Sequence, residues 1–200
     1  MKQKRLPIIS KAKDVVYTPD DIAKDIVSHF APSGKVLEPC RGDGAFYRHL
    51  PADSYWCEIA EGKDFFQWNE RVDWIVSNPP FSIFANWMRH SFEISDNIVY
   101  LLPITKVFNS YTLIQLIYSW GGIKEVYVIG GGSMLKSERL GFAIGAVHFV
   151  KGYEGGINIA FRQSAEHRLH LTAFGDGTAA VNPLLGGTQA EVPSATFGGW

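Results

Sequence analysis

Residues 72–84, VDWIVSNPPFSIF, join a mostly apolar, strand-like run to an abrupt ending at Asn78-Pro79-Pro80-Phe81. Neither proline can donate a backbone hydrogen bond, so a central strand has to stop at Asn78. The prolines either simply end the strand or hold Asn78 and Phe81 rigidly at its carboxyl end. Because open α/β sheets bind ligands at the carboxyl ends of their strands, the second interpretation predicts a functional site here.

Segments on both sides of this stretch alternate between strand and helix patterns. Thr18 is predicted as the N-cap of a first helix, with Pro19 at its first position and a T-x-x-D capping box, and Ile22, Ile26 and Phe30 form its apolar stripe. Further helices are predicted over 82–94 and 109–120, and strands over 35–40, 54–59, 72–78, 97–103, 124–130, 141–150 and 157–162. This alternation indicates an α/β fold with a doubly wound, mostly parallel sheet. The last strands lack helices between them, which favours an antiparallel end.

The composition is typical of a globular protein, with 200 residues, 46% hydrophobic and 20% charged. No apolar run approaches the roughly 18 residues of a membrane helix, and the N-terminus lacks a secretory signal. Cys40 and Cys57 alone make a disulfide scaffold improbable and fit a reducing cytoplasm. A net charge of −1 argues against a strongly basic nucleic-acid binder, but charge can be local.

Three regions are expected along the chain. Residues 1–13 form a basic arm that either contacts phosphates or is simply solvated, and residues 14–165 form a single domain. Residues 166–200, rich in Gly, Ala and Pro, are expected to be an irregular tail. The glycine-rich loop before residue 142 carries Lys136 and Arg139, and is either an ordinary connection or a substrate-facing loop.

A second group of chemical signals precedes the NPPF stretch. LEPCRGDG, residues 37–44, is a strand followed by a turn in which Gly42 and Gly44 let the backbone approach a ligand. Glu58 ends the next strand, where a carboxylate can accept both hydroxyls of a ribose. Asp64 follows with an aromatic ring beside it, a suitable receptor for an adenine. Each of these signals is weak by itself. Because they all follow the ends of predicted strands, together they predict a pocket that binds a nucleoside.

YTP, LEPCRGDGAF, WCEI, GKDFF and SNPPF, in this order, resemble the successive motifs of S-adenosylmethionine-dependent amino-methyltransferases, most closely the DNA adenine-N6 methyltransferases. The resemblance covers roughly residues 15–162 and implies a Rossmann-like class I methyltransferase domain with S-adenosylmethionine as cofactor. The cofactor-binding residues that it implies are Tyr17, Thr18, Pro19, Glu38, Pro39, Cys40, Gly42, Gly44, Glu58, Ile59, Asp64, Phe65 and Asn78.

The same resemblance implies a catalytic segment made of Asn78, Pro79, Pro80 and Phe81. The Asn78 side chain and the Pro79 carbonyl would accept hydrogen bonds from the target amine and favour a tetrahedral nitrogen for direct in-line methyl transfer. Phe81 would stack on an adenine flipped out of the duplex. Alternatively, Phe81 only packs in the hydrophobic core. Lys136, Arg139 and Phe142 are further candidates for substrate contact.

Two departures from the family pattern affect these expectations. Only IAEGK separates Glu58 from Asp64, so an intervening helix and strand are shortened or absent. The chain also has no room for a large target-recognition domain, so a partner or second subunit is expected to supply specificity, and a bacterial or phage-infected cell is the expected setting. The Pro39-Cys40 pair lies in the cofactor turn, which makes Cys40 an improbable nucleophile, and no metal site is predicted.

The substrate stays open at the level of the sequence. Besides adenine in DNA, the NPPF chemistry suits an RNA amino group or a protein glutamine amide, since all of these nitrogens are planar and conjugated. A third alternative is an inactive cofactor-binding module that works through a partner.

Overall fold

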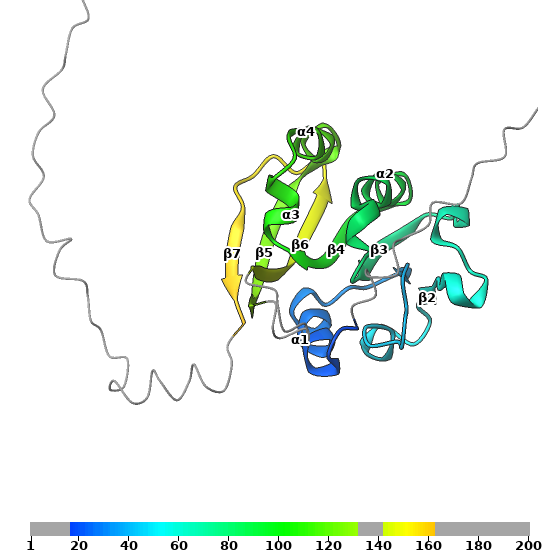
Figure 1. Ribbon diagram of the computed structural model, residues 1–200. Coiled ribbons are helices and arrows are strands. Elements are labelled where there is room, and N and C mark those ends of the chain that lie inside the picture. Colours follow the sequence, from blue (N-terminus) through cyan, green and yellow to red (C-terminus); the bar gives the residue numbers. More distant parts are fainter. Residues whose placement is uncertain (1–16, 132–141, 163–200) are drawn as a thin grey trace, which may run out of the picture. The chain divides into compact units, whose positions relative to one another are not determined.

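One seven-stranded sheet organises the chain in the computed structural model, in which residues 17–131 and 142–162 are described. The strand order is β2-β1-β3-β4-β6-β5-β7 (Figure 1). The strands are β1 (Val36–Glu38), β2 (Tyr55–Trp56), β3 (Val72–Ser77), β4 (Ser95–Pro103), β5 (Gly121–Gly131), β6 (Ala143–Lys151) and β7 (Asn158–Phe161). The predicted arm over 1–13, the predicted tail over 166–200, Lys136 and Arg139 lie outside the described residues.

The sheet is parallel at one end and mixed at the other. Strands β2, β1, β3 and β4 pair in parallel, whereas β6 lies antiparallel between β4 and β5, and β7 pairs in parallel with β5. This confirms the predicted mostly parallel sheet with an antiparallel end. The centre of the sheet is buried on both faces, which explains why β4 reads as a continuous apolar run rather than an alternating one.

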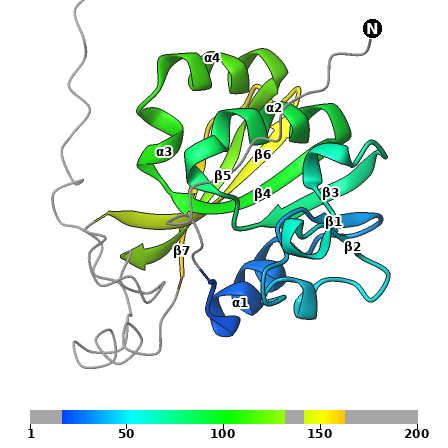
Figure 2. The same cartoon turned by 45° about the vertical axis from the view of Figure 1, so that its right-hand side comes forward.

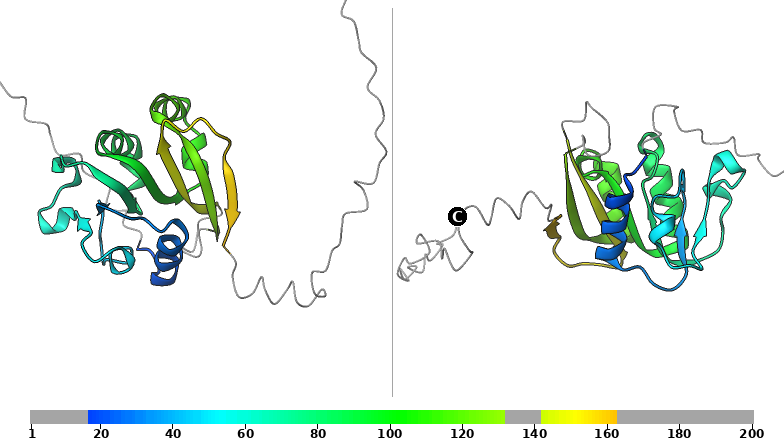
Figure 3. Two further views of the ribbon diagram at one scale, coloured as in Figure 1. Left: turned by 180° about the vertical axis from the view of Figure 1, so that it is seen from behind. Right: turned by 90° about the horizontal axis from the view of Figure 1, so that it is seen from below.

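Helices cover both faces of the sheet and form two separate cores (Figures 2 and 3). On one face lies α1 (Asp20–Phe30), whose buried Ile22 and Ile26 confirm the predicted stripe. On the other face lie α2 (Phe84–Ile94), α3 (Thr105–Phe108) and α4 (Tyr111–Trp120). The resulting three-layer arrangement leaves the carboxyl ends of β1, β2 and β3 at one edge, near the start of α1.

The beginning of α1 differs from the prediction. The helix starts at Asp20, its N-cap is Pro19, and no side chain caps it, so the predicted Thr18 capping box is wrong. The Pro19 carbonyl instead accepts the first helical hydrogen bonds, from the backbone N–H groups of Ile22 and Ala23. Thr18 therefore lies one residue outside the cap, and its hydroxyl is used in a contact described below.

The connection from β2 to β3 is as short as the sequence predicted. It contains two single-turn 3₁₀ helices, η3 (Ile59–Glu61) and η4 (Phe65–Gln67), and an isolated bridge between Glu58 and Lys63. Within this described segment there is no further strand, so β2 forms the edge of the sheet. In residues 17–131 and 142–162, no helix is long and apolar enough to cross a membrane.

Candidate active site

A cavity of about 420 Å³ lies at the carboxyl ends of β1, β2 and β3. This volume is within the usual range for small-molecule and cofactor sites. Twelve of the residues predicted from the sequence line it: Tyr17, Thr18, Glu38, Pro39, Cys40, Gly42, Glu58, Ile59, Asp64, Phe65, Asn78 and Pro80. Segments that are up to about sixty positions apart in the sequence therefore contribute to a single site, as expected at this edge of an open α/β sheet.

Asn78 is held in place at the end of β3. Its side-chain Nδ2 donates a hydrogen bond of 3.2 Å to Oγ1 of Thr18, which is itself buried. The next residue, Pro79, has no N–H and is buried, so the backbone after Asn78 cannot continue the ladder and turns away into the short helix η5 (Phe81–Ile83). The bond to Thr18 fixes the plane of the Asn78 amide at the wall of the cavity.

Glu38 is the most unusual group in the cavity. It ends β1 with only 1% of its surface exposed, and its Oε2 atom is buried without a hydrogen-bond partner. Burial raises the pKa of Glu38 to about 9, against smaller opposing effects from a backbone hydrogen bond at Tyr47 and from Arg41. The carboxyl group is therefore protonated at neutral pH, and a cation placed in the cavity would favour its ionised form.

The turn after β1 brings backbone close to Glu58. Gly42 has φ of 53°, which an L-residue rarely adopts, and its N–H donates to Oε2 of Glu58 at 2.8 Å. The other carboxylate oxygen, Oε1, accepts from the N–H of Ala60 at 3.1 Å and caps η3. These two bonds orient the carboxylate at the cavity wall, and a carboxylate has enough lone pairs to accept further bonds from a ligand.

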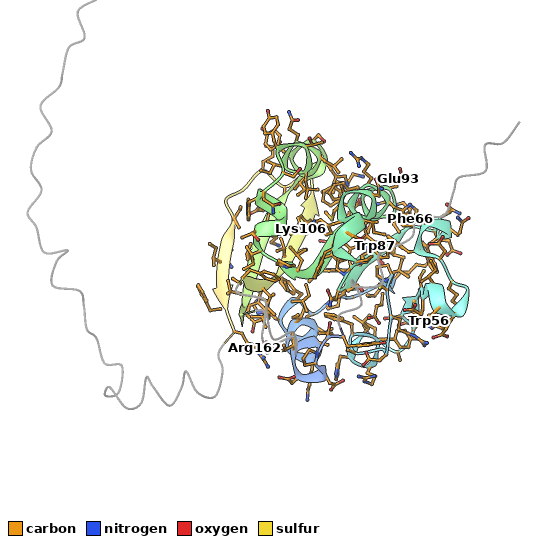
Figure 4. The ribbon with its side chains drawn as sticks, in the orientation of Figure 1. Trp56, Phe66, Trp87, Glu93, Lys106 and Arg162 are labelled. Carbon is orange, nitrogen blue, oxygen red and sulfur yellow. The ribbon has the colours of Figure 1, made fainter. Side chains whose placement is uncertain are left out.

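Aromatic rings form one wall of the cavity, beneath α2. Asp64 caps η4 by accepting from the N–H of Phe66 at 3.0 Å. Phe65 is buried against Trp87, with 4.5 Å between the ring centroids, whereas Phe66 is half-buried and meets Trp87 edge-on at 5.5 Å (Figure 4). Phe66 is therefore better placed than Phe65 to offer its ring to a ligand.

An ion pair and cation–π contacts link the turn after β1 to β2 and the connection that follows it. Arg41 forms an ion pair with Glu61, and both residues line the cavity. The Arg41 guanidinium lies 3.7 Å from the Trp56 ring centroid, and Nζ of Lys63 lies 3.3 Å from the same centroid. Both cations therefore lie within cation–π distance of the Trp56 ring.

The cysteines are unsuited to nucleophilic chemistry in this environment. Burial, with help from nearby Glu58 and Glu38, raises the pKa of the Cys40 thiol to about 12. Burial likewise raises the pKa of Cys57 to about 11. Both remain neutral thiols at physiological pH. Among the described residues, no group of three or more His, Cys, Asp or Glu side chains is arranged to hold a metal ion.

Several predicted site residues lie away from the cavity wall. Pro19 opens α1, and Gly44 closes the turn after β1 by donating its N–H to the Arg41 carbonyl at 2.8 Å. Pro79 is buried, and Phe81, in the short helix η5 directly before α2, packs half-buried against the core beneath α2. Phe142 packs against the core beneath α1 and does not line the cavity.

The structure also adds lining residues that the sequence did not single out: Arg41, Asp43, Ala45, Phe46, Ala60, Glu61, Phe66, Ile83 and Trp87. Most of them are neighbours of predicted residues along the chain. Trp87 is different, because it belongs to the apolar stripe of α2 and is almost fully buried. Its spacing in the sequence is that of an ordinary core residue. The sequence therefore does not show whether Trp87 only packs in the core or also lines the cavity.

Comparison with known proteins supports the fold but gives no family by sequence. No protein-family model matches the chain, and no curated protein sequence matches it. Solved structures do match. A Listeria monocytogenes protein assigned to the class I S-adenosylmethionine-dependent methyltransferases aligns with a TM-score of 0.60 at 10% identity, over 83% of this chain and 72% of its own.

Two further structures have the same architecture. A modification subunit assigned to a type I restriction enzyme of Vibrio vulnificus aligns with a TM-score of 0.52 at 12% identity, over 78% of this chain but 48% of its own. A Pyrococcus horikoshii protein assigned as an RNA methyltransferase aligns with a TM-score of 0.50 at 14% identity, over 66% of this chain and 82% of its own. The described domain therefore has the Rossmann-like fold of class I methyltransferases, and it spans about half of the restriction-enzyme subunit.

Proposed function

We propose that this protein binds S-adenosylmethionine and transfers its methyl group to the exocyclic N6 amine of adenine in DNA. The main evidence for this proposal is the position of Asn78. Its amide, fixed by Thr18, bounds the same cavity as Glu38 and Glu58. A group able to orient an amine thus shares one space with groups able to hold a nucleoside cofactor.

The residues of the cavity fit this cofactor. Glu38 offers a buried carboxyl oxygen without a partner, which suits a ligand that carries an ammonium group and a sulfonium group. Glu58 offers oriented carboxylate oxygens to the two ribose hydroxyls, and Asp64 with Phe66 offers an acceptor and a ring to the adenine. S-adenosylmethionine, when bound, supplies an activated methyl group for direct displacement.

Asn78 would act on the amine of the substrate. An adenine amine shares its lone pair with the ring and is a poor nucleophile. A carbonyl oxygen that accepts an N–H bond out of the ring plane favours a tetrahedral nitrogen, and the lone pair then becomes available for attack. Because the hydrogen bond to Thr18 holds the Asn78 amide in place before the substrate arrives, little reorganisation is needed during the reaction.

DNA is proposed as the substrate on the strength of the motif order and of NPPF, which resemble the adenine-N6 methyltransferases of DNA. The restriction-enzyme modification subunit with the same fold is compatible with this choice. RNA amines and protein amides present the same conjugated nitrogen and are tested in the same experiment. The domain leaves sequence recognition to other chain segments or to a second subunit.

The test is transfer of labelled methyl from S-adenosylmethionine to unmethylated DNA, to RNA and to a protein extract. We expect label in DNA, and its loss by about a hundredfold to a thousandfold in Asn78→Ala, since one oriented polar group of this kind supplies about 3–4 kcal/mol. Asn69→Ala, at an exposed position after η4, is the matched control and keeps full activity.

Each other outcome rejects part of the proposal. Label in RNA or protein that depends on Asn78 would reject DNA as the substrate while keeping the transfer chemistry. Cofactor binding without transfer to any of the three acceptors would identify an inactive binding module.

A further inference from the structure

Most of the exposed apolar side chains of the described domain come from elements on one side of the sheet. Ten large hydrophobic residues are exposed, and seven of them belong to α3, α4, β7 and the residue before β7. These seven, which we call the α4–β7 face, are Phe108, Tyr111, Ile114, Tyr118, Ile157, Ile159 and Phe161. Exposed patches of this kind, when they exceed a few hundred Å², mark sites of association.

The outer surface of α4 carries no charge. All its exposed residues are uncharged, including Tyr111, which is 75% exposed, and Tyr118, which is 84% exposed. The other long helices differ, since α1 exposes Asp20, Asp21 and Lys24, and α2 exposes Arg89 and Glu93. A helix that is apolar on the side facing the sheet and uncharged on the opposite side is expected to pack against protein on both sides.

The edge strand β7 continues this surface. Ile159 is aligned with Val126 and Phe161 with Val128 of β5, and those valines belong to the core beneath α2 and α4. The side chains of Ile159 and Phe161 therefore lie on the same side of the sheet as α4, where they are 60% and 68% exposed. Edge strands are normally protected by charges or prolines, and Asn158–Phe161 contains neither.

We propose that the α4–β7 face binds a second copy of the same chain around a two-fold axis. A two-fold interface brings one patch against itself, so a charged patch would repel its copy, whereas the exposed residues of α4 and β7 carry no charge. Antiparallel pairing of the two β7 edges satisfies their outer backbone groups symmetrically. On α4, Tyr111 and Tyr118 lie on either side of Ile114, so reversing one helix against the other brings Tyr111 toward Tyr118 of the second copy.

The size of the patch matches such an interface. Aromatic side chains bury about 150–250 Å² each when fully covered, so the exposed parts of the four aromatic residues and three isoleucines amount to roughly 700 Å² per copy. A specific interface buries about 800 Å² per partner. A nucleic acid is a poorer occupant, because the exposed residues of α4 and β7 include no lysine or arginine to contact phosphates.

Sedimentation equilibrium of the full chain tests this inference, which does not depend on the proposed methyl transfer. We expect a dimer within a range of about 1–100 µM. Tyr118→Lys and Phe161→Glu each should weaken dimerisation by at least about a hundredfold, because a charge is then buried against an uncharged partner. Tyr55→Glu, on the opposite edge strand β2, is the matched control at an exposed aromatic and leaves the dimer intact.

A mixing experiment tests the symmetry directly. Tyr118→Lys and Tyr111→Glu chains, each monomeric alone, should form a heterodimer when mixed, since the two-fold axis brings positions 118 and 111 together. Circular dichroism before mixing verifies that each variant is folded. A wild-type chain that stays monomeric throughout, or a dimer that Tyr55→Glu disrupts as strongly as Phe161→Glu, would overturn the proposal and leave another protein or residues 163–200 as the occupant of the face.

Discussion

The buried carboxyl of Glu38 leads to a specific prediction about stability. Replacing Glu38 by glutamine keeps the size of the side chain and a neutral polar head but removes the titrating group. The unfolded chain ionises this group near its ordinary pKa of 4.5, whereas the folded chain holds its proton up to about pH 9. Between these values the unfolded state has lost a proton that the folded state retains.

The sign and size of the effect follow from this difference. Because the unfolded state binds fewer protons, the free energy of unfolding of the wild type falls as pH rises from about 4.5 toward about 9. Each pH unit in that window is worth about 1.4 kcal/mol. The free energy of unfolding of Glu38→Gln does not fall in this way, because the variant has no titrating group at position 38. Between about pH 5.5 and pH 8, the free energy of unfolding of Glu38→Gln minus that of the wild type should therefore rise by about 3 kcal/mol.

Urea denaturation of the ligand-free wild type and variant at several pH values measures this quantity. Glu93→Gln, an exposed carboxyl on α2, is the control and should follow the wild type at every pH. If the stability difference between Glu38→Gln and the wild type were independent of pH, Glu38 would be ionised in the folded protein, and the reasoning from its burial would be refuted.

Three further predictions concern the walls of the cavity. Thr18→Val removes the acceptor for Nδ2 of Asn78 and should slow single-turnover methyl transfer about fivefold to tenfold, with recovery in Thr18→Ser; an unchanged rate would contradict the orienting role of this bond. Phe66→Ala should weaken cofactor binding by about tenfold in calorimetry without unfolding the protein. Phe65→Ala should instead lower the free energy of unfolding by about 3–5 kcal/mol. The reverse pattern would show that Phe65 contacts the cofactor and Phe66 belongs to the core. Cys40, with its pKa raised to about 12, should resist thiol reagents at pH 8 until the protein unfolds, and Cys40→Ser should keep methyl transfer; rapid labelling of the native protein would show that the thiol is accessible and ionised.

Much of the fold was predictable because its signals are local. The two prolines after Asn78 end β3 because neither can donate a backbone hydrogen bond, and the long apolar run of β4 indicates a strand buried on both faces. The short stretch between Glu58 and Asp64 predicted that an intervening helix and strand are shortened or absent, and the structure has only η3 and the bridge between Glu58 and Lys63 there.

The parts that sequence reasoning missed depend on contacts between distant segments. Thr18 looks like a helix cap, but the proximity of Asn78, sixty positions later, gives its hydroxyl another partner. Phe65 and Phe66 are adjacent and chemically identical, and only their packing against α2 in the folded chain distinguishes the buried ring from the half-buried one. The place of β6 between β4 and β5 likewise follows from tertiary pairing rather than from chain order.

The proposed function requires Asn78 to orient an adenine amine beside bound S-adenosylmethionine. Nucleoside mass spectrometry of unmethylated DNA incubated with the protein and the cofactor tests it most directly, alongside calorimetric binding of the cofactor to Asn78→Ala. We expect N6-methyladenine with the wild type, a reduction of at least about a hundredfold with Asn78→Ala, and cofactor binding retained in that variant. Methylation at another base position, or N6-methyladenine formed equally well by Asn78→Ala, would contradict it.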